Sequence, residues 1–328
     1  MFRKKFAFSM LLIAFYIGLS SWGFLVHKTV NQIAIYNLPA PLQAFFHANM
    51  EYMVEQAPRP DNRKRLDKLE SSKHILDIEK YGDNAINTMP LDLNTAIKKY
   101  TFDSLKSHGW GPYNVIIQLD NLTNAFKSKN KDSILYYAAD LGHYIGDMHV
   151  PLHTTMNYDG QLTDQKGMHS LWESFIPSFA LSQYDLYNQH KAVYLKNPAE
   201  ALWKNIRKAN ALLPDMFAKE TKLSANFTPA TKYKTQKMYG KEVQVYTKEF
   251  AEAYAIELGP TINGQLIASA NMLTDFIYTA WVNAGKPDLG TTRAMSSQLE
   301  EELKAYKSNQ LIKNGLLLSK KTKTKEED

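Results

Sequence analysis

The sequence predicts an all-α protein with a single, mainly helical domain. Apolar residues recur at helical spacing in five segments: 27–38, 40–53, 114–126, 133–149 and 263–282. Strand patterns are sparse, and the clearest one, an alternating segment at 233–247 around Gly240, predicts one short β-hairpin. With 328 residues, 44% of them hydrophobic, the chain is long enough to bury one large core.

The strongest helix prediction covers residues 133–149. Its apolar residues lie on one stripe: Leu135, Ala138, Ala139, Leu141, Tyr144 and Ile145. Pro151 ends this helix, because the residue before a proline resists helical geometry. Segments rich in Pro, Gly, Asn or Asp predict loops at 57–61, 156–167 and 284–290. No segment has the composition of a linker that divides residues 22–290, which we interpret as one domain.

The first 21 residues have the pattern of a secretory signal peptide. Arg3, Lys4 and Lys5 precede an apolar segment at 6–19, and the small residues Ser20 and Ser21 suit a cleavage site. We therefore expect export to the periplasm or the medium. The alternative is an uncleaved membrane anchor, although the apolar segment is short for a membrane span.

Net charge does not by itself indicate nucleic-acid binding, and the lack of cysteine excludes stabilisation by disulfides. The formal net charge is +6, but 36 basic and 33 acidic residues remain once Arg3, Lys4 and Lys5 are set aside. That balance is too mild to indicate nucleic-acid binding on charge alone. The chain has no cysteine, so an exported form has no disulfides. At the other end we expect a helical extension at 291–318 and a disordered charged tail at 319–328.

Two histidine and carboxylate pairs predict a metal site. His143 and Asp147 lie four residues apart on a predicted helix, so both face the same side. His169 and Glu173 repeat this spacing, and His153 follows the helix-ending proline. Imidazole and carboxylate are zinc ligands, and this spacing lets two of them reach one ion.

For other residues, the evidence for a role in binding metal or phosphate is weaker. His27, Asp61 and His74 are candidate ligands, and Asp77 is a candidate for orienting His74. His149 is excluded as a ligand, because six residues after His143 it points about 240° away around the helix. Trp172 is expected in the core. Among the basic residues around Asp61, namely Arg59, Arg63, Lys64 and Arg65, only Arg63 has as strong a claim to bind phosphate as to face solvent.

The ordered set of these residues resembles a known superfamily. The set is Trp22, His27, Asp61, His74, His143-x3-Asp147-x5-His153 and His169-x3-Glu173. It is similar to the zinc-dependent phospholipase C and single-strand-specific zinc nuclease superfamily, and the resemblance runs from Trp22 to Val282. It implies a mainly helical domain that holds three zinc ions.

The resemblance also implies which residue binds which ion. Asp61, His74, His143 and Asp147 would bind the first zinc, and His153, His169 and Glu173 the second. The third zinc would take the α-amine and carbonyl of Trp22, His27 and the other oxygen of Asp147. Only cleavage between Ser21 and Trp22 creates that amine.

The resemblance implies hydrolysis of phosphodiesters by a metal-bound hydroxide. Asp147 would bridge two metals, and Asp61 would orient water or act as a base. Arg63, Asn157 and Tyr158 are candidates for contacting the substrate. We expect a monomer, since no feature indicates an obligate protein partner.

The substrate stays open between two enzyme classes. Glu173, where nucleases tend to have aspartate, and the lack of cysteines favour a phospholipase C-like enzyme. The short spacing from Trp22 to His27 favours the alternative, a single-strand-specific nuclease and 3′-nucleotidase. A third hypothesis, of another class, is a non-catalytic exported binding protein that metals merely stabilise; the complete ligand set argues against it.

Overall fold

Helices form almost all of the regular structure, so the prediction of an all-α fold with one short hairpin is confirmed. The computed structural model describes residues 24–238, 240–290 and 296–321. In this part, β1 (Tyr233–Met238) pairs antiparallel with β2 (Lys241–Tyr246), and Tyr233 lies opposite Tyr246. The predicted signal peptide and the predicted ligand Trp22 lie outside the described residues.

The described helices differ widely in length. The longer ones are α2 (Phe24–Tyr36), α3 (Ala40–His47), α4 (Met50–Gln56), α7 (Leu93–Tyr100), α8 (Phe102–His108), α9 (Gly111–Ser128), α10 (Lys131–Asp147), α13 (Pro198–Asn210), α14 (Leu213–Ser224), α16 (Lys248–Leu258), α17 (Thr261–Asn283) and α18 (Ser297–Lys307). The short ones are α5 (Arg59–Arg63), α6 (Ala85–Thr88), α11 (Met168–Ser170), α12 (Ile176–Ala180) and α15 (Pro229–Lys232). None of the helices in the described ranges is long and apolar enough to cross a membrane.

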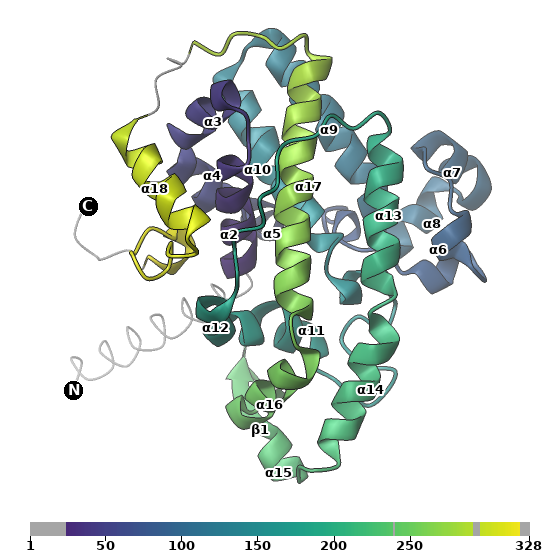
Figure 1. The fold of residues 1–328 in the computed structure, drawn as a ribbon. Coiled ribbons are helices and arrows are strands. Elements are labelled where there is room, and N and C mark those ends of the chain that lie inside the picture. Colours follow the sequence, from purple (N-terminus) through teal and green to yellow (C-terminus); the bar gives the residue numbers. More distant parts are fainter. Residues whose placement is uncertain (1–23, 239, 291–295, 322–328) are drawn as a thin grey trace, which may run out of the picture.

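Helix α10 lies at the centre of the fold. It packs against α2, α9 and α17, and the long helix α17 crosses the molecule beside it (Figure 1). The Asn130 side chain accepts a hydrogen bond from the Ser133 amide and so caps the start of α10. The helix ends at Asp147, four residues before Pro151, and its predicted apolar stripe is buried. Because both faces contact other helices, α10 is fixed from several sides.

Two local predictions need correction. The predicted helix 40–53 is two helices, α3 and α4, because the Asn49 side chain donates to the Phe45 carbonyl and competes with helix continuation. The predicted loop 57–61 contains the start of α5, where Pro60 occupies the first turn, the one place in a helix that tolerates proline. The predicted loops at 156–167 and 284–290 contain turns and irregular structure.

The C-terminal extension packs into the main core. Leu299, Tyr306 and Leu317 are buried there among residues of the central helices. The predicted disordered tail starts too early: Ser319 lies in a short 3₁₀ helix, η6 (Leu318–Lys320), and its hydroxyl lies 2.8 Å from that of Thr29 on α2. Residues 322–328 of that predicted tail lie outside the described residues. Thr29 anchors this segment because a buried hydroxyl requires a hydrogen-bond partner.

A second, smaller core lies under one of the predicted ligand segments. It includes Trp172 from η4 (Leu171–Phe175), a π-helical segment, and Phe250 from α16. Trp172 is therefore a core residue, as its sequence position predicted. This core fixes the backbone on either side of Glu173.

Candidate metal centre

The fold brings together all eight predicted ligand side chains that it describes. They come from segments spread over about 150 residues of the chain. The ligands and their segments are His27 on α2, Asp61 on α5, His74 just after η1 (Ser71–Lys73), His143 and Asp147 on α10, His153 on η3 (Pro151–Thr154), His169 on α11 and Glu173 on η4. They fall into overlapping groups whose ligand atoms lie within 4.8 Å of one another.

The first group surrounds one oxygen of Asp147. Its Oδ2 atom lies 2.7 Å from His74 Nδ1 and 3.4 Å from His143 Nε2. Asp61 Oδ1 lies 3.6 Å from the same nitrogen of His143. Ligand atoms bound to tetrahedral zinc lie about 3.3 Å apart, given zinc bonds of about 2.0–2.1 Å. His74, His143 and Asp147 therefore have the spacing that one zinc ion requires, and Asp61 lies beside the two imidazoles of this group.

The second group contains His153, His169 and Glu173. The two imidazole Nε2 atoms lie 2.7 Å apart. Glu173 Oε2 lies 2.7 Å from the Nε2 of His169 and 3.3 Å from that of His153. The helical spacing of His169 and Glu173 turns both side chains toward His153, as the sequence predicted.

His27 lies between these two groups. Its Nε2 atom is 3.5 Å from Asp147 Oδ1, the oxygen that the first group does not use. The imidazole is buried, and neither of its nitrogens has a hydrogen-bond partner among the described residues. A buried polar atom without a hydrogen-bond partner costs free energy. The Nε2 atom of His27 therefore suits a metal ion as its partner.

Charges in the centre favour metal binding. Burial raises the pKa of Asp147, but His143, His74 and His153 outweigh it and lower that pKa well below its usual value. For Glu173, too, burial raises the pKa, and His169 and His153 lower it further than burial raises it. Both carboxylates are therefore ionised, as metal ligands must be.

His153 carries a proton that a metal would replace. Burial lowers the pKa of His153, yet Asp147 and Glu173 raise it to about 9. Because only a neutral imidazole binds a metal, binding at His153 releases a proton near neutral pH. The buried, mixed nitrogen and oxygen donors thus fit zinc.

Backbone carbonyls orient two of the imidazoles. His143 Nδ1 donates to the Ala57 carbonyl over 3.0 Å, and His153 Nδ1 donates to the His74 carbonyl over 2.8 Å. A carbonyl only accepts, so the proton sits on Nδ1 and leaves Nε2 free to bind a metal. The bond from His153 to the His74 carbonyl also connects the second ligand group to the first.

Glu70 is a buried residue of the centre that the sequence analysis missed. Its Oε1 atom lies 3.5 Å from His74 Nε2, on the opposite side of the ring from Asp147. The carboxylate also accepts hydrogen bonds from Tyr144 and, over 2.7 Å, from Lys73. Glu70 precedes His74 by four residues, and that spacing was the available signal.

Asp77, which the sequence suggested for orienting His74, lies elsewhere. Its nearest charged partner is His108, at 4.0 Å. The polypeptide turns sharply between His74 and Asp77, outside any helix, so closeness in sequence does not bring their side chains together. Glu70, which lies within ion-pair distance of His74 Nε2, is therefore a better candidate than Asp77 for orienting this ring.

The basic residues around Asp61 divide into two kinds. Lys64 Nζ lies 2.7 Å from Asp61 Oδ1, at the edge of the metal ligands. Arg63 donates to Asp140 over 2.8 Å and to Tyr144 over 2.9 Å, so its guanidinium is bonded to two side chains of α10. The sequence analysis favoured Arg63 over Lys64 for phosphate binding; the structure places Lys64 closer to the ligands.

The two predicted substrate contacts in the loop differ in exposure. The Asn157 amide bonds Thr163 and the Leu162 backbone, so it shapes its own loop. Tyr158 is 51% exposed, and its ring meets that of His169 edge-on, with centroids 6.3 Å apart. The excluded His149 lies outside every ligand group of the described residues, with its Nδ1 on the Ile145 carbonyl.

Two glycines let α2 approach α10 closely enough to bring His27 into the centre. A Cβ atom at Gly146 would lie 2.9 Å from His27 Nδ1, and one at Gly142 would lie 2.7 Å from the Asn31 amide. The His27 and His143 rings stack with centroids 4.0 Å apart. Any larger residue at 146 would push the His27 ring away.

The family model described as S1/P1 nuclease matches residues 22–280, which is most of the chain. The chain belongs to the S1/P1 nuclease family. This is a family of zinc-dependent hydrolases that act on phosphodiester bonds, within the superfamily that the sequence motifs indicated. No curated protein matches the chain. The family match favours the nuclease alternative over the phospholipase C-like reading.

Replacing Gly146 by alanine tests the close approach of α2. We expect Gly146→Ala to displace His27 and to weaken zinc binding by about 10-fold, the loss typical when a group that positions a metal ligand is changed. Gly264→Ala is the control, because its added methyl meets open space on α17 and stabilises the helix by up to about 1 kcal/mol. Zinc titration against a competing chelator measures the first effect. Equal zinc affinity in both variants would contradict the packing argument.

Replacing Glu70 by glutamine tests its orienting role. We expect Glu70→Gln to weaken the first zinc by about 10-fold, since outer partners of metal ligands contribute this much. Asp77→Asn is the matched control and should leave zinc affinity within about twofold. If Asp77→Asn weakened zinc binding more than Glu70→Gln, Asp77 and not Glu70 would be the residue that orients His74. The same chelator competition reports both variants.

Proposed function

We propose that the protein is an exported zinc-dependent nuclease that cleaves single-stranded nucleic acid and removes the phosphate of 3′-nucleotides. The observation that carries the proposal is the pair of oxygens of Asp147, which face two different ligand groups. A single carboxylate placed between two groups supports a cluster of closely spaced ions. Membership of the S1/P1 nuclease family supports the nucleic-acid substrate.

With three zinc ions bound, this ligand set would leave a positively charged site. The described ligands include three carboxylates, those of Asp61, Asp147 and Glu173, and five imidazoles that bind metal in the neutral form. Zinc ions held there would lower the pKa of a bound water toward about 7 and attract the phosphate oxygens. We propose three ions, the number that the sequence resemblance implies. Because five of the ligands are neutral, they do not cancel the positive charge of the zinc ions, which attracts an anionic phosphodiester.

Two ligands of the centre are partly exposed to solvent. The side chains of Asp61 and His169 are 27% and 36% exposed, whereas those of His74, His143 and Asp147 are at most 2% exposed. Lys64, beside Asp61, is also partly exposed. Substrate therefore reaches the ligands from the side of Asp61, Lys64 and His169.

Asp61 and Lys64 have complementary tasks at this opening. Burial raises the pKa of Asp61, but His143 and Lys64 lower it further, so the carboxylate stays ionised and can orient water. The Lys64 ammonium lies 2.7 Å from Asp61 and is free to bond a phosphate oxygen once substrate enters. Both residues act on the exposed face of the first group.

An aromatic side chain beside the opening suits a nucleobase. Tyr158 projects from the 156–167 loop next to His169, and half of its surface is free. Stacking of one base on an aromatic ring contributes about 1–3 kcal/mol and tolerates any base. This arrangement favours single-stranded substrates, whose bases are accessible. Every described ligand comes from one chain, and we propose that the protein acts as a monomer.

A parallel assay distinguishes the substrates. Mature zinc-loaded protein is incubated with single-stranded DNA, RNA, a 3′-nucleotide and phosphatidylcholine vesicles. We expect cleavage of the two nucleic acids and the 3′-nucleotide. Turnover of phosphatidylcholine alone would overturn the nuclease proposal in favour of a phospholipase C. Absence of any turnover in protein with full zinc content would leave only a binding role.

Removing the Asp147 carboxylate tests the shared ligand. We expect Asp147→Ala to lower kcat/KM by more than about 100-fold, the upper loss for an outer-shell partner, because two ligand groups lose an oxygen together. Asp132→Asn, at the exposed start of the same helix, should change the rate by less than twofold. Zinc content of both variants is measured in parallel. Retained activity in Asp147→Ala with full zinc content would refute the shared role.

A further inference from the structure

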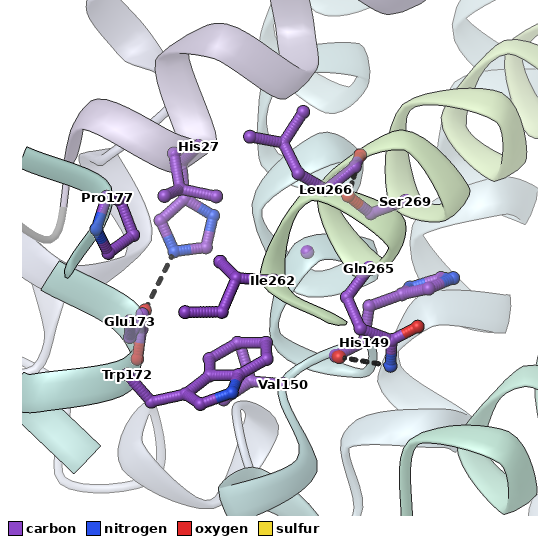
Figure 2. A pocket seen from close by; sticks show the side chains of 12 residues that line it. His27, His149, Val150, Trp172, Glu173, Pro177, Ile262, Gln265, Leu266 and Ser269 are labelled. Atoms are coloured by element: carbon purple, nitrogen blue, oxygen red, sulfur yellow. Dashed lines mark hydrogen bonds and ion pairs between the residues drawn. The ribbon is translucent and has the colours of Figure 1, made fainter. Parts of the chain in front are cut away.

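Glu173 faces two sets of histidines with its two carboxylate oxygens. Its Oε2 atom lies 2.7 Å from His169 and 3.3 Å from His153, in the second group. Its Oε1 atom lies 3.4 Å from His27 Nε2. Figure 2 shows this approach of His27 to Glu173. The resemblance that the sequence carries assigns Glu173 to the second zinc only.

The oxygen that faces His27 completes a further group of ligand atoms, besides the one that His27 forms with Asp61 and His143. His27, Asp147 and Glu173 each offer one atom, and the three lie within 4.8 Å of one another. His27 Nε2 is 3.5 Å from Asp147 Oδ1 and 3.4 Å from Glu173 Oε1. Both separations match the distance of about 3.3 Å between two ligands of tetrahedral zinc. The spacing thus suits one ion held by all three side chains.

A direct hydrogen bond does not explain the arrangement as well. At these separations His27 Nε2 forms no hydrogen bond with either carboxylate, although all three side chains are buried. The other side of His27 and Glu173 borders a small, mainly apolar cavity whose lining includes Val150, Ile262 and Leu266 (Figure 2). A buried nitrogen with two carboxylate oxygens in front and apolar side chains behind is a ligand for a cation.

The local backbone and the residue type both place Glu173 for this role. Glu173 lies in the π-helical segment η4, which packs against α2, and single π-helical turns are frequent at functional sites. Glutamate is one methylene longer than aspartate. Aspartate at this position would lack the reach to serve His169 and His27 from the same backbone.

We propose that Glu173 bridges the second and third metal ions, with Oε2 on the second and Oε1 on the third. This inference rests on the proposed function, because it requires a cluster of several zinc ions. Asp147 would link the first ion to the third, and Glu173 the third to the second. Occupancy of the third site is then coupled to the second through one side chain.

Zinc titration of Glu173→Asp tests the bridge without relying on activity. The mature, full-length protein is titrated with zinc against a chelator of known affinity, and stoichiometry and successive affinities are measured. We expect wild type to bind three ions and Glu173→Asp to bind the third about 10-fold or more weakly. Glu249→Asp, an exposed change of the same type, should behave as wild type. Unchanged affinity for the third ion in Glu173→Asp would overturn the bridge.

A second background locates the effect. His27→Ala should lose the third ion, and adding Glu173→Asp to it should then leave the remaining two affinities unchanged. If Glu173→Asp lowers the affinity for one of the two remaining ions in this background, the substitution acts at the second site and the bridge is refuted. Thermal unfolding of the metal-free variants shows whether they fold. Wild type that binds only two ions also refutes the bridge, whereas fewer than two ions would refute the proposed zinc chemistry itself.

Discussion

The burial of the Asp147 carboxylate is the constraint on which the rest of the structure depends. An ionised carboxylate in the interior is costly unless charged or hydrogen-bonding partners surround it. Here His74, His143 and His27 supply those partners from three separate segments. The fold must therefore hold three imidazoles around one helix end. Packing of α2 and α17 against α10 meets this requirement by fixing α10 on more than one side.

Close helix packing and metal chemistry are linked at Gly142 and Gly146. Both glycines lie on the face of α10 that meets α2, and a Cβ atom on either would collide with an α2 side chain. Glycine weakens a helix interior by about 1 kcal/mol relative to alanine. That cost is offset here because only the absence of side chains lets His27 stack on His143.

Two carboxylates link the imidazoles of the centre. Asp147 and Glu173 each present two oxygens to different imidazoles, and every imidazole among the described ligands lies beside one of them. Partners outside the ligand groups, such as Glu70 and the Ala57 carbonyl, hold the rings in place. Interaction with such partners restricts ring rotation, so the site is organised before substrate arrives.

The sequence by itself determined the helical fold, the hairpin and two ligand pairs, because these follow from local periodicity and from the spacing of residue types; the other candidate ligands came from the resemblance of the ordered set to a known superfamily. His143 with Asp147 and His169 with Glu173 are visible as pairs since each pair occupies one helical face. Only the tertiary structure decided that Glu70 rather than Asp77 supports His74, that Lys64 rather than Arg63 lies at the ligands, and that Glu173 reaches His27. These contacts join segments far apart in the chain or depend on where an irregular turn points a side chain, and no local pattern encodes either.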